Sequence, residues 1–298
     1  MASLSPQASA DLVTVDPYSA ESFDQGGPSS QPYTHLGGMW QPGPNMAGAT
    51  VVPGPGGATW SIMGPGFSDA STFDTDHVGT TMAITALAVP GFAFADYAAM
   101  IDAALNVWAS VSNFTNLGMV TDGGVAPGAP EAVGGALGDI RIGAWEIAAE
   151  TVLAHGFEPG NEAVFGAGGS IGGDIHIDVN RVWSDDPTDT NSDADYDLFT
   201  VLLHELGHAL GLGHSGVSGS VMESTYAGAR RTLHADDIAG IQAIYGAPLV
   251  SSPEPSGFLL MSAAGLGFVT LRRLRPRKHE GVRSIASACT RSGSRLCR

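Results

Sequence analysis

The spacing of apolar residues predicts helices and strands in alternation across the middle of the chain. Residues 95–111 carry apolar side chains at intervals of three or four, which is typical of a helix with one buried face. Segments in which apolar and polar residues alternate predict strands. With no internal repeat, this mixture favours one α/β or α+β domain. The expected helices are 95–111, a segment ending at about Leu210, and about Ala235 to Tyr245; the expected strands are Thr59–Met63, Phe114–Val120, Asp139–Trp145 and Asp174–Val179.

Segments rich in Gly, Pro or acidic residues separate these elements. Residues 25–57 oppose helix and sheet, so we interpret residues 1–57 as a linker or extended lead-in, with ordered structure from about Ala58. Ala8-Ser9-Ala10 resembles a small-x-small cleavage site, which is either the remnant of a signal peptide or a coincidence in a small-residue stretch. The acidic loop 184–197 either attracts cations or is a solvated charged loop.

The C-terminus changes character at Pro253-Glu254-Pro255. Fifteen mostly apolar residues follow, Gly257–Leu271, and then a cluster of arginines. As a helix this run spans about 22 Å, less than the ~30 Å of a bilayer core. The proline-bounded linker and the basic flank indicate a membrane stop signal, and a buried core helix is the alternative.

Charge and cysteine content exclude several classes of protein. The chain has 298 residues, 41 of them Gly, and a net charge of −17. Nine of the 13 basic residues lie in 272–298, so residues 1–271 hold 29 acidic residues against four basic ones. A body this acidic repels phosphate backbones, which argues against nucleic-acid binding. Cys289 and Cys297 are the only cysteines, so neither disulfides nor thiolate metal ligands organise the main fold.

Residues 204–214 read HELGHALGLGH and carry the chemistry of the chain. His204 and His208 are one helical turn apart, so both imidazoles reach one Zn²⁺ from the same helix face. Gly211 can take a positive φ and turn the chain, which brings His214 back as third ligand. Three neutral ligands leave a position for water, and Glu205 can take the proton of that water as it attacks a carbonyl.

Met222 follows eight residues after His214, in SGSVMESTY. Read alone it is a core methionine. After the long histidine motif it completes the metzincin pattern.

At this point the chain resembles the matrixins, the matrix metalloproteinase-like metzincins, over most of 58–246. The resemblance rests on Ser215 directly after the third histidine of the motif and on four further stretches. These are ALNVWASVSNFTNLGMV, LAHGFEPG, GGDIHID and the closing LHADDIAGIQAIYG. It implies an α+β metzincin catalytic domain: a twisted, mixed, mostly parallel sheet, about three helices and a zinc cleft between two subdomains. It also implies that Met222 forms the floor beneath the zinc and that Tyr226 lies in the wall of the specificity pocket, where Ser224 replaces the usual proline.

The resemblance further implies metal sites that this chain matches only in part. Matrixins bind a structural zinc through a His-x-Asp pair and two later histidines, which match His155 and His176. The His-x-Asp pair has no counterpart in 143–152, where Glu146 and Glu150 are the candidate ligands. The alternative to a structural zinc is that His155 and His176 only form local hydrogen bonds. Asp178 matches a calcium ligand whose acidic companion is here Arg181, and Asp174 is a candidate for a different calcium site. No cysteine precedes residue 289, so the family's inhibitory cysteine is absent.

Residues 253–277 resemble the PEP-CTERM sorting signal of Gram-negative bacteria, although 21 further residues follow Arg277. The resemblance implies export, a sorting or processing enzyme, and transient membrane association before release at the cell envelope or outside the cell. We therefore expect four parts. They are the lead-in 1–57, the peptidase domain 58–247, the sorting signal 248–278 and a tail 279–298 of unknown role.

These observations predict an exported, monomeric zinc endopeptidase acting on protein or peptide substrates. Its substrate is expected to lie extended along an edge strand in 161–171. One alternative is a non-catalytic surface or biofilm-matrix binding protein on a metzincin scaffold, against which the intact Glu205 argues. Another is a zinc hydrolase acting on a non-peptide bond.

Overall fold

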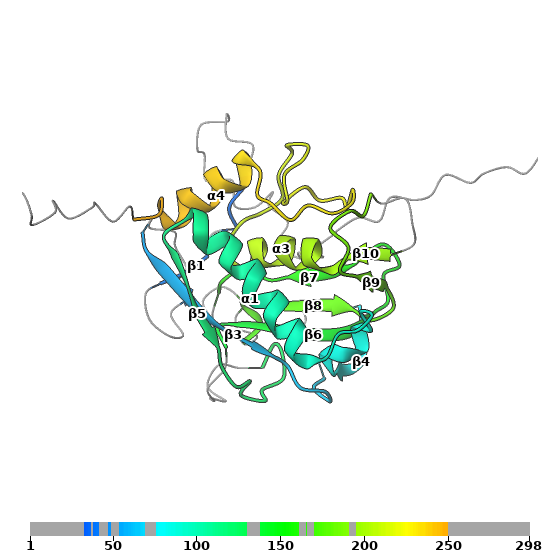
Figure 1. Cartoon of the computed structure of the whole chain (residues 1–298). Helices are drawn as coiled ribbons and strands as arrows, with labels where there is room; N and C mark the ends of the chain where they lie inside the picture. Colours follow the sequence, from blue (N-terminus) through cyan, green and yellow to red (C-terminus); the bar gives the residue numbers. More distant parts are fainter. Residues whose placement is uncertain are drawn as a thin grey trace, which may run out of the picture. The chain divides into compact units, whose positions relative to one another are not determined.

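A mixed six-stranded sheet forms the centre of the described part of the chain (Figure 1). The computed structural model describes residues 33–36, 38–41, 47–48, 54–68, 76–129, 138–160, 165, 170–190 and 195–249. All of them fall in one compact unit, Met1–Leu249. The predicted tail and all of the predicted sorting signal after residue 249 lie outside the described residues. The strands of this sheet are β3 (Gly56–Ile62), β4 (His77–Met82), β5 (Phe114–Met119), β6 (Ile140–Ile147), β7 (Ala154–Gly156) and β8 (Asp174–Asp178).

Strand order in this sheet is β5-β3-β6-β8-β7, and β4 also pairs with β6. β5, β3, β6 and β8 run parallel, whereas β7 and β4 are antiparallel to their neighbours. β7 therefore ends the sheet on one side as a short antiparallel strand. Two small sheets add β1 (Met39–Trp40) with β2 (Ala47–Gly48), and β9 (Val182–Ser184) with β10 (Asp195–Asp197).

Three α-helices accompany the sheet in the described residues: α1 (Phe94–Val111), α3 (Leu198–Ala209) and α4 (Ala235–Tyr245), with a short 3₁₀ helix η2 (Ile84–Leu87). The predicted helices 95–111 and 235–245 agree with α1 and α4, and α3 ends one residue before the expected Leu210. Each predicted strand is present, with ends shifted by up to three residues. The predicted α+β class, with a mixed, mostly parallel sheet and about three helices, is confirmed.

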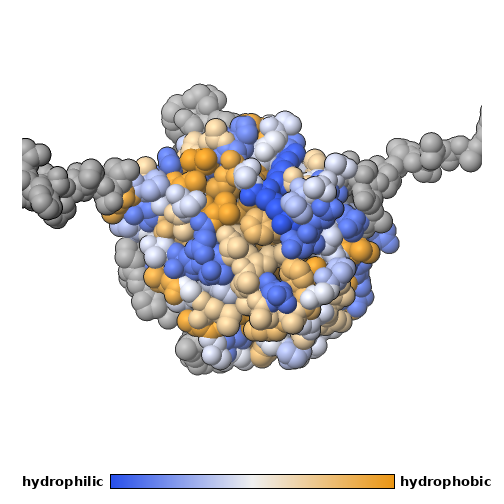
Figure 2. All heavy atoms as spheres, viewed as in Figure 1, coloured by the Kyte–Doolittle hydropathy of each residue, from blue (hydrophilic) through white to orange (hydrophobic). Residues whose placement is uncertain are grey.

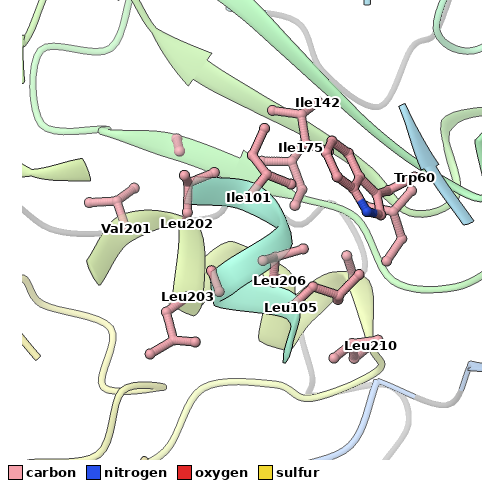
Figure 3. Close-up of a cluster of buried hydrophobic side chains, with 14 of the residues drawn as sticks. Trp60, Ile101, Leu105, Ile142, Ile175, Val201, Leu202, Leu203, Leu206 and Leu210 are labelled. Atoms are coloured by element: carbon pink, nitrogen blue, oxygen red, sulfur yellow. The ribbon is translucent and has the colours of Figure 1, made fainter. Parts of the chain in front are cut away.

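Apolar faces of α1 and α3 pack together against the sheet. Figure 3 shows Ile101 and Leu105 of α1 beside Leu206 of α3, with the strand residues Ile142 and Ile175 close to them. These five side chains are all at most 1% exposed. Burying one such side chain stabilises the fold by about 1.5–3 kcal/mol, so this contact holds α3 in a fixed position on the sheet. Trp108 adds an indole N–H bond of 3.0 Å to the Leu203 carbonyl across the two helices.

The outer face of α1 is only weakly apolar. Figure 2 shows pale-orange residues across the centre of the face along which α1 runs in Figure 1, bordered by hydrophilic residues and, at the upper left, by more strongly hydrophobic ones. Ala99 and Ala103 are exposed on this helix. Among the described residues, no helix combines the length and the apolar character needed to cross a membrane. The apolar run 257–271 lies outside them.

Residues before Ala58 also contribute to the domain. β3 begins at Gly56, and β1 contacts β3. Trp40 is 3% exposed and Met39 is 2% exposed, so both belong to the main core. The expectation that ordered structure starts near Ala58 is therefore wrong, because the Gly- and Pro-rich composition gave no sign of the two apolar residues that anchor this segment. The outer limits predicted for the peptidase domain, 58–247, stay a prediction.

Candidate active site and metal centres

Helix α3 presents the histidine motif from a fully buried position. Its N-cap Asp197 accepts hydrogen bonds from the backbone N–H and the hydroxyl of Thr200, at 3.1 and 2.6 Å. Arg231 donates to the same carboxylate, through Nε at 3.0 Å. A carboxylate at a helix N-terminus satisfies donors that have no partner within the helix. These bonds fix the start of α3, and with it the position of His204 and His208 relative to the sheet.

The three histidines of the motif converge on one point. Their ligand atoms all lie within 4.8 Å of one another. His204 directs Nδ1 at the Val221 carbonyl, and His208 directs Nδ1 at the Leu212 carbonyl, both at 2.7 Å. Each carbonyl fixes the proton on Nδ1, so the two Nε2 atoms, 3.1 Å apart, present lone pairs to the centre. Predicted ligands His204, His208 and His214 are therefore brought together.

Burial keeps two of these imidazoles neutral. It lowers the pKa of His204 to about 3, with His214 contributing, and it lowers the pKa of His208 well below its ordinary value. A metal ligand must offer a free lone pair, so neutral histidines at physiological pH suit a metal site. Three histidines without thiolate or further carboxylate ligands are a donor set that zinc accepts.

Glu205 directly follows the ligand His204 on α3, and its carboxylate is buried. The residue is 0% exposed, and neither carboxylate oxygen has a hydrogen-bond partner among the described residues. Burial raises the pKa of Glu205 to about 8. A buried acid without a protein partner normally faces an ion or a water molecule. A cation at the three histidines would favour the charged carboxylate, so this observation fits a metal with a water beside Glu205.

The turn around Met222 lies directly beneath α3. Met222 is 2% exposed, and a Cβ added at Gly207 would come within 2.3 Å of its sulfur. Gly207 lies between the two ligands of the helix, so Met222 packs under the metal site. The Met222 carbonyl also accepts from Ser215 N at 2.7 Å, next to His214. Predicted supporting residue Met222 is thus in place.

Two neighbouring acids of α4 hold the segment that follows His214. Asp237 accepts from the Ser220 hydroxyl and from the N–H groups of Val221 and Met222, the latter two at 2.9 and 3.2 Å. Asp236 accepts from the Ser215 hydroxyl at 2.6 Å. Sequence reasoning noted this helix only as a closing element. The two acids at the start of α4 are the sequence feature that could have indicated this role, because buried carboxylates at a helix N-terminus commonly hold a neighbouring turn.

Tyr226 links the turn after Met222 to the start of α3 and to the acidic loop. Its hydroxyl accepts from Asp197 N at 2.9 Å and donates to Asp189.

Two further contacts anchor the acidic loop. The Ala229 N–H donates to the Asp189 carbonyl at 2.8 Å, and Arg231 pairs with Asp185 at 2.7 Å. The described part of the predicted acidic loop is thus tied to the domain by ion pairs and hydrogen bonds, rather than simply solvated.

Residues 33–36 and 38–41, here called the N-terminal segment, hold the end of α3. Leu36 N donates to the Gly211 carbonyl and Gly213 N donates to the Thr34 carbonyl, both at 2.9 Å, so the two stretches pair antiparallel. The Thr34 hydroxyl donates to the His214 carbonyl at 2.9 Å. Trp40 Nε1 donates to the Ala209 carbonyl at 2.7 Å. The turn that carries the third histidine is therefore fixed by residues more than 160 positions away in sequence.

Replacing Trp40 with Phe is expected to weaken this anchorage. The Ala209 carbonyl loses its indole donor, which costs about 1–3 kcal/mol for a buried group, and zinc bound at the three histidines should be released to a weaker chelator. Urea unfolding and competition with a zinc chelator measure the two effects. Trp183→Phe is the matched control, since its indole donates to the Asp178 carbonyl of β8, at 2.8 Å, and not to α3. Equal losses in both variants would contradict the assignment.

A second cluster joins three histidines from three strands. His77 of β4, His155 of β7 and His176 of β8 place their ligand atoms within 4.8 Å of one another. His155 and His176 face each other across the β7–β8 pair, as the resemblance predicted for a metal site. His77 was missed, because it precedes α1 and lies far from both in sequence. The sequence candidate Glu146 pairs with Val78, the neighbour of His77, so its side chain points to the face of the sheet opposite His77.

Predicted calcium ligands Asp174 and Asp178 are both buried and both close to arginine. Asp178 pairs with Arg181 Nε at 2.8 Å, and it accepts from Asn180 N at 2.9 Å and Ile147 N at 3.2 Å. Asp174 lies 3.6 Å from Arg141, and burial raises its pKa although Arg141 and His176 oppose this. The guanidinium of Arg181 supplies positive charge where the family has a cation and a second acid. Calcium at either residue stays a prediction.

Fold and site together define a class. Three helices on a mixed, mostly parallel sheet, with HELGHALGLGH at the end of α3 and Met222 beneath it, fit a metzincin-type α+β domain.

Comparison with known sequences narrows this class. Residues 145–246 match the family model described as matrixin. Human neutrophil collagenase is 44% identical over 110 residues, which is 36% of this chain and 20% of the collagenase. Rat matrilysin is 45% identical over 97 residues, 32% of each chain. The matches thus span between a fifth and a third of these relatives, and support a matrixin-type metzincin domain. His77 and the N-terminal segment lie outside the family match.

Proposed function

We propose that this chain is a zinc-dependent endopeptidase that hydrolyses internal bonds of proteins or peptides. The observation that carries the proposal is the buried Glu205 carboxylate, without a hydrogen-bond partner in the described residues, next to three convergent histidines. The similarity of residues 145–246 to matrixins, and of the chain to collagenases and matrilysin, supports the same activity.

His204, His208 and His214 would hold the zinc. When bound, zinc supplies Lewis-acid activation of a water molecule and of the scissile carbonyl. Glu205 takes the proton from the attacking water and later delivers it to the leaving amine. The carbonyls of Val221 and Leu212 keep the protons of His204 and His208 on Nδ1, which maintains both rings as ligands throughout. Because Glu205 is buried, the electrostatic interactions of its carboxylate are stronger than they would be in bulk water.

An extended substrate would add to the sheet alongside β7. This strand ends the sheet next to α3, and a Cβ added at its Gly156 would lie 2.8 Å from a Glu205 carboxylate oxygen. A peptide paired with β7 would therefore pass directly by the general base. The expected edge strand in 161–171 lies mostly outside the described residues, and Phe165, Ser170 and Ile171, which are described, form no strand. We therefore propose β7 as the edge along which substrate lies.

Export, sorting at 253–277 and passage through the cell envelope remain part of the proposal and rest on the sequence pattern alone. Monomeric state and a sorting or processing enzyme as partner have the same basis. The non-catalytic binding protein and the hydrolase of a non-peptide bond are the alternatives. No contact among the described residues favours either.

The proposal is tested by incubating the zinc-loaded full chain with a mixed peptide library and analysing the products by mass spectrometry. We expect cleavage at internal bonds, loss of cleavage with 1,10-phenanthroline, and recovery when zinc is added back. Cleavage that survives complete removal of the metal would contradict the mechanism. A zinc-loaded chain that leaves every peptide intact would support a binding protein instead.

A further inference from the structure

We propose that Asp76 and His77, at the start of β4, complete a second zinc site with His155 and His176. In matrixins the corresponding pair of ligands belongs to a His-x-Asp segment, which this chain lacks in 143–152. In this chain a different strand, β4, brings a histidine to His155 and His176. The site rests on its own ligands and does not depend on the proposed cleavage reaction.

The geometry of the three histidines suits one cation. They come from three separate strands, yet all three ligand atoms fit within 4.8 Å. His155 is 2% exposed and His176 is 0% exposed. Ring centroids of His77 and His176 are 4.6 Å apart, and those of His77 and His155 are 5.9 Å apart. Three imidazoles brought this close in a buried place form a donor set that zinc binds well.

The orientation of His77 is fixed by packing. Its ring stacks on the Trp145 indole, with centroids 4.3 Å apart and planes inclined by 7°. Trp145 is 0% exposed and belongs to β6, with which β4 pairs. In that pairing His77 is opposite Ile147, two residues after Trp145, so all three side chains share one face. A ligand whose rotamer is set by the core binds a metal without further loss of conformational entropy.

Asp76 is the carboxylate best placed to be the fourth ligand. Its Oδ2 lies 3.8 Å from His155 Nε2. Asp174 lies at the same distance from His176 Nε2, but its charge is already balanced by Arg141 at 3.6 Å. Asp76 also precedes His77 directly in the chain, so one short stretch of backbone brings both ligands. The three histidine nitrogens converge, and the Asp76 carboxylate lies beside one of them, so these side chains offer the number and kind of ligands that a structural zinc site needs.

The connection between β6 and β7 explains why another segment is needed. Arg181 donates to the carbonyls of Ala149 and Val152, at 3.0 and 3.2 Å, which closes this connection tightly beside Asp178. It contains no histidine. A zinc bound by β4, β7 and β8 would instead join the segment before α1 to β7, the strand beside Glu205. We infer that this zinc stabilises the edge strand on which substrate is proposed to lie.

The test measures zinc per chain in the full-length protein after dialysis, by inductively coupled plasma mass spectrometry. We expect about two zinc ions in the wild type and about one in His77→Ala. Asp76→Asn is expected to release the second zinc to a weaker chelator than the wild type requires. Glu146→Gln is the matched control and should keep both, since its side chain lies on the other face. His208→Ala should also keep one, which separates this site from the catalytic one.

A second measurement does not depend on the variants folding. Cobalt in place of zinc gives visible absorption for each tetrahedral site, so the wild type should show two sites that lose cobalt at different chelator concentrations. Thermal unfolding should shift downward when the second site empties. One metal ion in the wild type, or two in a folded His77→Ala, would overturn the proposal. Two in the wild type but one in Glu146→Gln would overturn the choice of ligand.

Discussion

Changing Glu205 to Gln is expected to abolish peptide cleavage while the catalytic zinc stays bound. The three histidines are untouched, and Gln has nearly the same shape as the carboxyl it replaces. The amide cannot accept the proton of the attacking water, so kcat/KM should fall by about 10²–10⁴-fold or more. The buried position of Glu205, with no other partner among the described residues, is the reason to expect an effect this large.

Zinc content, thermal unfolding and kcat/KM on one library-derived peptide measure this expectation together. Glu150→Gln is the control, because Glu150 is exposed and lies outside both histidine clusters. Retention of both zinc and cleavage in the Glu205 variant would refute the role of general base. Loss of cleavage together with loss of zinc would show instead that Glu205 supports the metal site.

Changing Gly211 to Ala is expected to be the most damaging substitution outside the ligands. Gly211 has a φ of +102°, which an L-residue adopts at a cost of about 1–2 kcal/mol. An added Cβ would also lie 2.4 Å from the Gly38 carbonyl oxygen, in the N-terminal segment. Backbone must therefore move on one side or the other. Either movement displaces the turn before His214, so we expect lower stability and weaker binding of the catalytic zinc.

Gly216→Ala is the matched control for this prediction. It lies two residues after His214, is exposed, and an added Cβ would meet no heavy atom within 4 Å. Urea unfolding and competition with a zinc chelator measure the two variants side by side. A Gly211 variant that matches the control in both measurements would show that the turn tolerates a side chain, and that the N-terminal segment does not hold it.

Local patterns predicted those parts of the molecule whose residues are close in sequence. The apolar spacing in 95–111 is the period of a helix, and α1 has it because Ile101 and Leu105 pack against the core. Likewise the zinc motif lies within 11 residues, so a helix followed by a turn is enough to predict that its three histidines converge. The positive φ of Gly211 follows from the same local argument.

Contacts between distant segments could not be predicted in this way. His77 lies 78 positions before His155, and no local pattern links it to the β7–β8 pair. Only the pairing of β4 with β6 places it beside Trp145 and His176. For the N-terminal segment the composition led to a wrong prediction. The Gly- and Pro-rich stretch around Trp40 indicated a linker, whereas the Trp40 indole is buried and bonds to the end of α3.

The sequence by itself therefore determined the chemistry of the proposed catalytic site, since its ligands and base belong to one helix and one turn. The tertiary structure alone decided what holds that turn and which strand completes the second histidine cluster. The physical reason is that a helix sets side-chain positions through bonds between near neighbours. Strand order and the packing of an irregular segment depend instead on hydrogen bonds and buried surface shared by residues far apart in the chain.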